Sequence, residues 1–278
     1  MKIYDLINFG AKTLKNKGIL SNRLDSEILL SYAMGISREK LLINEKNVGY
    51  DEINKFKTFI LRRSKKEPVA YITKIKEFRS KNFFVDKNSL VPRPETELLI
   101  DPIISFFKEK KIFFLDVGIG TGCIIFSILN ELKYSKAIGI DNCKKTLTNA
   151  RKNLIKLELE NRAKILNRSI NKIFGYKFDL IVSNPPYIRT RDLNHLSDDI
   201  TNYEPRSALD GGNDGLDVIK KVIYKSTHIL KLNGILALEI GTGQYKQVKR
   251  ILNENKFKII VTVKDYKDNI RCIYSTLK

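Results

Sequence analysis

Residues Phe114-Leu115-Asp116-Val117-Gly118-Ile119-Gly120-Thr121-Gly122 decide the fold of this 278-residue chain. The apolar first half is typical of a buried strand, and the region after Gly122 is expected to be a helix. The three glycines between them permit positive φ angles and let a ligand approach the backbone closely. A strand, a glycine turn and a helix in this order predict a ligand site at the carboxyl end of a parallel strand.

The spacing of the glycines distinguishes a site for a dinucleotide from a site for a cofactor without phosphates. A dinucleotide site requires G-x-G-x-x-G after the strand, whereas this chain has G-x-G-x-G followed by Cys123. Asp116 suits a cationic ligand better than a pyrophosphate, and S-adenosylmethionine (SAM) carries an ammonium and a sulfonium but no phosphate. Asp141 ends the next apolar run and is expected to accept hydrogen bonds from both ribose hydroxyls. The pattern therefore predicts SAM.

A second informative segment is Asn184-Pro185-Pro186-Tyr187, which follows the apolar run 178–182. The two prolines fix the backbone and provide no N–H group. The Asn184 side-chain oxygen and the Pro185 carbonyl would then accept hydrogen bonds from a planar amino group, with the Tyr187 ring packed beside it. A simple turn is the alternative for the tetrapeptide, and a plain pocket wall is the alternative for Tyr187. Together with the glycine turn and Asp141, the segment predicts SAM-dependent N-methyl transfer.

Apolar runs and helical patterns alternate after Lys111, which predicts a parallel sheet with helices on both faces. The expected strands span 112–117, 137–140, 165–166, 178–182 and 235–240, and the expected helices span 122–132, 144–158 and 215–231. Residues 257–263 and 271–276 are expected to form an antiparallel pair at the sheet edge.

The first part of the chain has a different pattern. Apolar residues recur at helical spacing up to about residue 72, which predicts a small helical bundle with Gly18 and Gly35 as helix ends and Ser37 as a cap. Residues 73–92 are expected to form a hairpin or linker, and residues 93–278 the sheet domain. A helix is expected over 95–107, with a break or kink at Pro102.

Composition sets further bounds. The net charge of +20 allows either an acidic or nucleic-acid partner or a lysine-rich bias spread over the surface. Three scattered cysteines and two histidines argue against a structural metal site, so no metal is expected, and they fit a reducing cytoplasm. The sequence contains neither a run of about 18 apolar residues nor a signal-peptide pattern, so no membrane association is expected.

The chain resembles the HemK/PrmC-type methyltransferases, which modify the glutamine N5 of the Gly-Gly-Gln loop in peptide chain release factors. The resemblance runs nearly end to end and includes the helical N-terminal region. The segments that carry it are Glu67-Pro68-Val69-Ala70-Tyr71-Ile72, Leu90-Val91-Pro92-Arg93-Pro94-Glu95-Thr96-Glu97, Asp116 to Gly122, Ser183 to Ile188, Tyr203-Glu204-Pro205-Arg206-Ser207-Ala208-Leu209-Asp210-Gly211-Gly212, Asp214-Gly215-Leu216, and Leu238-Glu239-Ile240-Gly241 with Gln244.

The resemblance implies an α/β fold, a Rossmann-like class I SAM-dependent methyltransferase domain with a mostly parallel seven-stranded sheet, and a small N-terminal helical domain that recognises substrate. It assigns Gly118, Ile119, Gly120, Thr121, Gly122 and Asp141 to SAM, and Asn184 to both SAM and substrate. Asn184, Pro185, Pro186 and Tyr187 would hold the glutamine amide. Ser169 and Ile170 stand where relatives often carry an acidic and an aromatic residue beside the adenine.

The resemblance also places Arg93 and Glu95 in a loop at the mouth of the active site, although packing between domains is an equal alternative for them. Glu204 and Gly211-Gly212 are expected to form a structural or substrate-facing loop. The expected partner is a release factor in the cytoplasm, without direct binding of nucleic acid. The competing functions are a nucleic-acid amino-methyltransferase acting on adenine N6 or guanine N2, and an inactive methyltransferase fold that only binds.

Overall fold

The computed structural model describes residues 1–43 and 47–277 and divides into two compact units. The helical unit comprises Met1–Ile75 and Ser197–Tyr203, and the sheet unit comprises Lys76–Leu196 and Glu204–Lys278. The chain thus enters the sheet unit after Ile75, leaves it after Leu196 and returns at Glu204. No feature of the sequence pointed to Ser197–Tyr203 as part of the helical unit.

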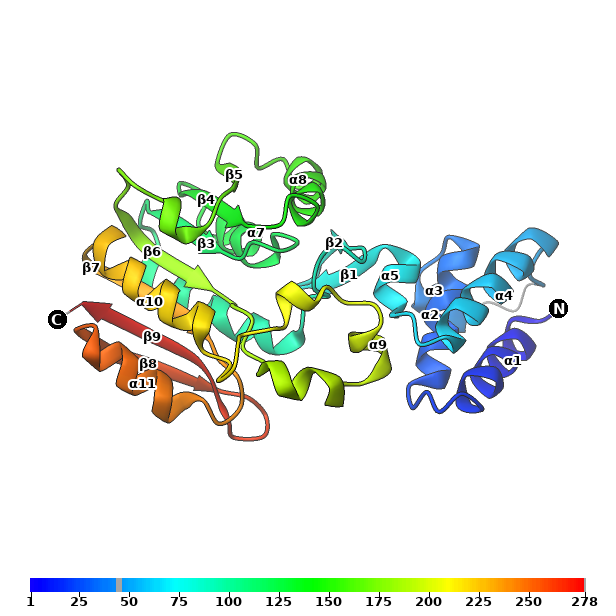
Figure 1. The fold of residues 1–278 in the computed structure, drawn as a ribbon. Helices are drawn as coiled ribbons and strands as arrows, with labels where there is room; N and C mark the ends of the chain where they lie inside the picture. The colour runs from blue at the N-terminus through cyan, green and yellow to red at the C-terminus, as the bar shows by residue number, and fades with distance from the viewer. Residues whose placement is uncertain (44–46, 278) are drawn as a thin grey trace. The chain divides into compact units, whose positions relative to one another are not determined.

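Five helices of the helical unit surround one apolar cluster (Figure 1). They are α1 (Ile3–Lys15), α2 (Asn22–Met34), α3 (Arg38–Leu42), α4 (Tyr50–Ser64) and α5 (Val69–Thr73). The short α9 (Asp198–Thr201) belongs to the same unit but has no buried residue. Two predicted helix ends are confirmed, because Gly35 adopts φ 67° at the end of α2 and the Ser37 hydroxyl accepts from the Lys40 N–H at the start of α3. The helix expected to stop at Gly18 ends at Lys15. A buried ion pair joins Asp25 of α2 to Arg63 of α4 at 2.7 Å.

The sheet unit begins with the expected hairpin and continues as alternating strands and helices. Its elements in chain order are β1 (Ile75–Phe78), β2 (Lys81–Phe84), the 3-10 helix η1 (Pro94–Leu99), α6 (Ile100–Phe107), β3 (Phe113–Val117), α7 (Cys123–Glu131), β4 (Lys136–Asp141), α8 (Thr146–Lys156), β5 (Ala163–Asn167), η2 (Ile170–Lys172), β6 (Phe178–Ser183), η3 (Thr190–His195), η4 (Arg206–Ala208), α10 (Asp217–Ile229), β7 (Leu230–Glu239), α11 (Tyr245–Glu254), β8 (Phe257–Lys264) and β9 (Ile270–Leu277).

The predicted helix over 95–107 is divided into η1 and α6, and the division falls two residues before Pro102, where a break or kink was expected. Because α6 begins at Ile100, Pro102 lies in its first turn, where a missing N–H leaves no hydrogen bond unmade.

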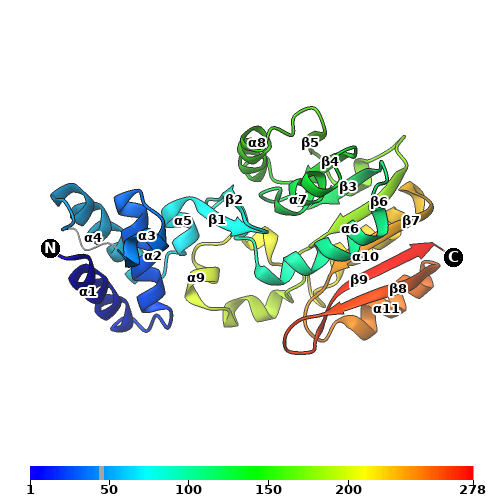
Figure 2. The same cartoon turned by 180° about the vertical axis from the view of Figure 1, so that it is seen from behind.

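The seven strands pair in the order β5-β4-β3-β6-β7-β9-β8. Neighbours from β5 to β7 are parallel, and β9 runs antiparallel to both β7 and β8, which confirms the mostly parallel sheet and its antiparallel edge pair. The order reverses between the neighbouring strands β3 and β6, and in open sheets of this kind ligands bind at such a switch point, beyond the carboxyl ends of the strands. Figures 1 and 2 show the sheet from its two faces.

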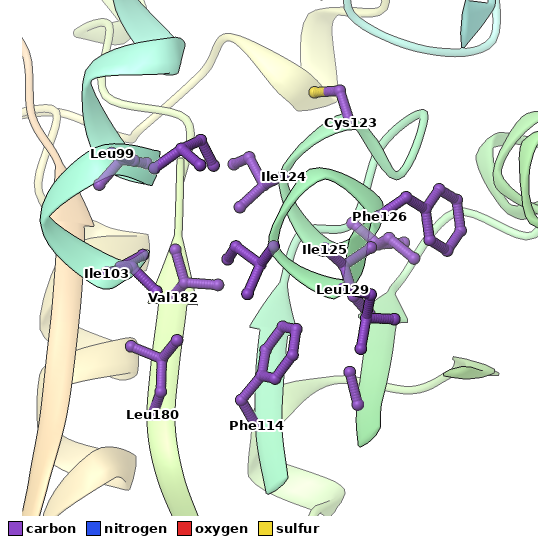
Figure 3. Close-up of a cluster of buried hydrophobic side chains, with 14 of the residues drawn as sticks. Leu99, Ile103, Phe114, Cys123, Ile124, Ile125, Phe126, Leu129, Leu180 and Val182 are labelled. Atoms are coloured by element: carbon purple, nitrogen blue, oxygen red, sulfur yellow. The ribbon is translucent and has the colours of Figure 1, made fainter. Parts of the chain in front are cut away.

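Alternating side chains of the central strands supply two apolar layers. Phe114 of β3 and Leu180 of β6 face the layer covered by α6, α7 and α8, where they meet Ile103 and Ile124 (Figure 3). Leu115 of β3 faces the opposite layer, which is covered by α10 and α11. Burial on both faces explains why these strands are almost continuously apolar in sequence.

Candidate active site

A cavity of about 480 Å³ lies at the carboxyl ends of β3, β4, β5 and β6 in the sheet unit. Most of the residues singled out in the sequence contribute to its lining. These are Arg93, Gly118, Ile119, Gly120, Thr121, Asp141, Ser169, Ile170, Asn184, Pro185 and Pro186. Four others, Glu95, Asp116, Gly122 and Tyr187, are not part of the lining.

The glycine turn after β3 has the backbone geometry that requires glycine. Gly118, Gly120 and Gly122 have φ angles of 79°, 55° and 84°, which side chains disfavour. A Cβ atom on Gly122 would also approach the Phe126 ring to 2.1 Å. The turn therefore brings bare backbone to the cavity while α7 packs closely behind it.

Asp141 at the end of β4 is held by two backbone donors. Its Oδ1 accepts from the Cys143 N–H at 2.8 Å, and its Oδ2 accepts from the Gly120 N–H at 3.3 Å. Burial raises the pKa of its carboxyl above the ordinary value, although these N–H groups oppose the shift. Each oxygen keeps a second lone pair, so the carboxylate can accept hydrogen bonds from the two hydroxyls of a ribose.

Asp116 has a different position from the one its sequence context suggested. Its carboxylate is fully buried, and neither oxygen has a hydrogen-bond partner among the described residues. It lies behind the glycine turn rather than in the cavity wall. Burial raises the pKa of this carboxyl to about 7; the nearby Ile125 N–H opposes the shift, and the negative charge of Asp141 adds to it.

The end of β6 fixes the Asn184–Tyr187 segment in the sheet. The Ser183 hydroxyl donates to the Val117 carbonyl at 2.7 Å, which joins the ends of β6 and β3. The Asn184 side-chain N–H₂ donates to the Thr96 hydroxyl at 3.0 Å. With its nitrogen held by η1, the amide of Asn184 has no donor to its Oδ1 among the described residues, and Asn184 lines the cavity, so Oδ1 is available to a ligand there.

Tyr187 lies behind the cavity wall in a polar cluster with Glu239 and Arg271. The Arg271 Nη2 donates to the Tyr187 Oη at 3.0 Å, and the Tyr187 Oη lies 3.4 Å from the Glu239 Oε1. Burial raises the pKa of Tyr187 to about 12 and that of Glu239 to about 7. The phenol therefore remains protonated at neutral pH.

A second loop supports the same segment from below. The Ile188 N–H donates to the Leu209 carbonyl and the Gly211 N–H donates to the Ile188 carbonyl, at 3.0 and 2.8 Å. A Cβ atom on Gly211 would come within 2.7 Å of the Pro186 carbonyl oxygen. Gly211 is thus a structural glycine, since no side chain fits between the two loops.

Arg93 and Glu95 have different environments. Arg93 lines the cavity and its Nη2 donates to the Glu204 Oε1 at 2.5 Å, while the Glu204 Oε2 accepts from the Val91 N–H at 3.2 Å. Glu95 is exposed. Glu204 therefore holds the loop that carries Arg93.

Sequence reasoning gave no role to Thr96 and Gln244, which are central to the structure of the site. Gln244 accepts from the Gly241 N–H at 2.8 Å and donates to the Tyr187 and Gly215 carbonyls at 3.0 and 3.2 Å. Both residues stand in segments already quoted for their pattern. Their sequence neighbours are mainly polar, glycine or proline residues, so no local pattern marks either residue as buried, and their hydrogen-bond partners are distant in sequence.

The cavity fits SAM in the chemistry of its walls. The glycine turn allows close approach, Asp141 has lone pairs for hydroxyls, and Ser169 and Ile170 offer a hydroxyl and an apolar side chain at the same wall. Within the described residues no helix combines the length and apolar composition needed to cross a bilayer. Nor does this part of the chain contain a cluster of three or more histidine, cysteine, aspartate or glutamate side chains that could hold a metal ion.

Solved structures with the same fold are methyltransferases. A methyltransferase from Pyrococcus furiosus aligns with a TM-score of 0.53 at 17% identity, covering 73% of this chain and 92% of that one. A ribosomal protein L11 methylase from Lactobacillus delbrueckii subsp. bulgaricus aligns with a TM-score of 0.51 at 18% identity, covering 68% and 81%. These likenesses confirm the predicted fold class, a Rossmann-like class I SAM-dependent methyltransferase domain.

Sequence relatives identify the family. The family described as PrmC N-terminal domain matches residues 5–73, and the family described as methyltransferase small domain matches residues 94–203. A release factor glutamine methyltransferase of Caulobacter vibrioides is 35% identical over 263 residues, covering 94% of this chain and 91% of the relative. One of Clostridium acetobutylicum is 36% identical over 275 residues, covering 96% and 95%. The chain is therefore a SAM-dependent methyltransferase and belongs to the release factor glutamine methyltransferase family.

Proposed function

We propose that this chain methylates the N5 nitrogen of the glutamine in the Gly-Gly-Gln loop of a peptide chain release factor, in the cytoplasm. Relatives that span nearly the whole chain carry the name of this activity. The observation that carries the proposal is the position of Asn184, which lines the cavity with its amide nitrogen bound to Thr96 and with no donor to its Oδ1 among the described residues.

SAM, when bound, supplies an electrophilic methyl group. The backbone of Gly118 to Thr121 would lie against it, with Asp141 accepting from its ribose and with Ser169 and Ile170 beside its adenine. Gly122 would act indirectly, by allowing α7 to pack behind the turn, and the buried carboxyl of Asp116 would likewise act from behind the turn rather than by contact.

The substrate nitrogen is a poor nucleophile because its lone pair is delocalised into the amide. The Asn184 Oδ1 and the Pro185 carbonyl would accept its two N–H groups and favour the pyramidal nitrogen that attacks. Preorganised groups of this kind act on the charge that develops in the transition state. No strong base is required, because the nitrogen loses its proton only after methyl transfer has made it acidic. Pro186 and Tyr187 would shape and support this cradle.

Other parts of the chain would bind the protein substrate. We assign Arg93 to the mouth of the cavity, where it is a guanidinium on a braced loop. Glu95 is exposed beside it and would contact the release factor rather than the reacting amide. The helical N-terminal region would recognise the release factor, and no metal and no direct nucleic-acid contact enter the reaction.

Labelled SAM tests the substrate directly. The protein is incubated with a purified release factor, with the variant of that factor whose loop glutamine is alanine, and with RNA and DNA. Label should enter only the unmodified factor. Equal labelling of both factors would refute transfer at the loop glutamine, and labelled RNA or DNA would favour a nucleic-acid amino-methyltransferase.

Asn184→Ala tests the residue that carries the proposal. We expect kcat to fall by about 100-fold or more, as for other lost preorganised groups, with the fold intact by circular dichroism. Asn253→Ala, at an exposed position of α11, is the matched control and should keep the activity of the unsubstituted protein. Near-normal turnover by Asn184→Ala would exclude the proposed role.

A further inference from the structure

The Asn184–Tyr187 segment has few backbone groups that can hold it in place. Pro185 and Pro186 have no N–H, so neither can donate a hydrogen bond to a neighbouring loop. The Pro185 carbonyl is nevertheless one of the two proposed acceptors for the substrate nitrogen. Its direction must therefore be set by the residues on either side. The Asn184 side chain is bound to η1 at one end, and the other end depends on Tyr187.

The Tyr187 hydroxyl lies between two buried side chains of opposite charge type. It accepts from the Arg271 Nη2 at 3.0 Å and donates to the Glu239 Oε1 at 3.4 Å. Arg271 and Glu239 are 3.6 Å apart, with 11% of the arginine side chain and none of the glutamate side chain exposed. The phenol thus uses both its donor and an acceptor site. A hydrogen bond from a guanidinium is also stronger than one between neutral groups.

Arg271 is itself held at its backbone and at its side chain. Its carbonyl accepts from the Ile240 N–H at 2.8 Å, where β9 runs beside the end of β7. Its Nη1 donates to the Thr242 hydroxyl at 3.1 Å, in the turn after β7. The guanidinium carbon lies 5.5 Å from the centroid of the Tyr187 ring, within the range of a cation–π contact. The Arg271 side chain is therefore a fixed support for this ring.

We propose that Arg271 is a positioning residue for methyl transfer. It holds the Tyr187 hydroxyl, with Glu239 balancing its charge, and thereby fixes the carboxyl end of the segment and the direction of the Pro185 carbonyl. Without this support the ring would stay packed, but the two acceptors of the cradle would no longer converge on one nitrogen. The inference rests on the proposed function, since it concerns the geometry of the acceptors for that reaction.

Tyr187→Phe tests this role, because it removes the hydroxyl and keeps the ring. We expect kcat for release factor methylation to fall by about 10-fold, the effect of losing one hydrogen bond with a charged partner. The KM for SAM should change little, since Tyr187 is not part of the cavity lining. A ring that only packed against the substrate would lose nothing in this variant. Tyr266→Phe, fully exposed between β8 and β9, is the matched control and should keep the activity of the unsubstituted protein.

A double-mutant cycle with Arg271→Lys tests whether the arginine acts through the Tyr187 hydroxyl. Lysine keeps the positive charge beside Glu239 but replaces the planar, two-armed donor by a single ammonium. In the presence of the hydroxyl, Arg271→Lys should lower kcat, and in Tyr187→Phe the same change should have a much smaller effect. Arg250→Lys, at an exposed position of α11, is the control. Circular dichroism establishes that each variant is folded.

Three results would overturn the positioning role. They are full kcat for Tyr187→Phe, full kcat for folded Arg271→Lys, and losses that multiply in the double variant. In each case, labelling of the release factor by the unsubstituted protein would still uphold the proposed function. If the unsubstituted protein itself labelled no release factor, the proposed function would fail, and the role of Arg271 in it would fail as well.

Discussion

Asp116 is the residue whose surroundings differ most from its expected role. A carboxylate without hydrogen-bond partners in a buried position is destabilising when charged. In the folded protein its pKa is about 7, against an ordinary value of 3.8. Because the folded state holds the proton more tightly than the unfolded state, stability is lost as the pH rises from about 4 to 7. Two buried carboxyls, Asp116 and Glu239, share this behaviour.

Asp116→Asn should flatten this dependence on pH. The free energy of unfolding of the unsubstituted protein should fall by on the order of 4 kcal/mol between pH 4 and 8 on account of Asp116, and the variant should lack that part of the fall. Denaturant unfolding without SAM at several pH values measures the difference. Asp5→Asn, on the exposed face of α1, is the control and should follow the unsubstituted protein. If the unfolding free energies of Asp116→Asn and of the unsubstituted protein fell in parallel with rising pH, the pKa of the Asp116 carboxyl would not be raised in the folded state.

At the scale of elements, the site depends on three turns that the Gln244 side chain joins by hydrogen bonds. Gln244 precedes α11 and binds the backbone of three separate segments, after β6, before α10 and after β7. Its amide supplies one acceptor and two donors, and no other residue type of that shape offers both. Gln244, in the turn between β7 and α11, thereby holds the Tyr187 backbone in place.

Gln244→Glu should disrupt this junction although the side chain keeps its shape. The carboxylate can accept from the Gly241 N–H but cannot donate to the Tyr187 and Gly215 carbonyls. We expect a loss of about 2 to 4 kcal/mol in unfolding free energy, since one buried and one partly buried carbonyl lose their donors, together with a lower kcat. Gln247→Glu, exposed on α11, should be close to neutral in both denaturant unfolding and turnover. Equal stability of the two variants would argue against the junction.

The order of the elements was largely predictable, and their ends less so. The expected strand over 137–140 corresponds to β4, and the expected edge pair corresponds to β8 and β9. β7 is longer at its start than the apolar run because Leu230 pairs with Phe178 before a register shift. The 3-10 helices η3 and η4 were not predicted, since they contain few apolar residues and derive their shape from contacts with other loops.

At the scale of the whole molecule, the two units have separate apolar cores. The helical unit includes an ion pair that is almost excluded from water, with 10% of the Arg63 side chain and 8% of the Asp25 side chain exposed. Arg63 also donates to the Lys66 and Glu67 carbonyls. Removing one partner of such a pair leaves a buried charge uncompensated, which is far more costly than losing a pair at the surface.

Arg63→Met should therefore destabilise the helical unit by about 3 to 5 kcal/mol. Its neighbour Arg62 pairs with Glu67 at 2.5 Å with 35% of its side chain exposed, so Arg62→Met should cost only about 0 to 1 kcal/mol. Hydrogen exchange should show lost protection in α1, α2 and α4 for Arg63→Met. Protection of the glycine turn by SAM should be unchanged. Equal hydrogen exchange in the two variants would show that the buried Asp25–Arg63 pair stabilises the helical unit no more than the Arg62–Glu67 pair does.

The sequence alone determined the class of fold and the methyl donor, and it predicted the proposed reacting segment, because each is written in contiguous residues. A strand, a glycine turn and a helix follow one another from Phe114, and Asn184–Tyr187 follows directly from an apolar strand. Tertiary structure decided how these groups are oriented. Thr96 is 88 residues from Asn184 and Gln244 is 57 residues from Tyr187. Strand order and helix packing bring such pairs together, and the same packing buries Asp116 behind the turn, so neither result can be inferred from local pattern.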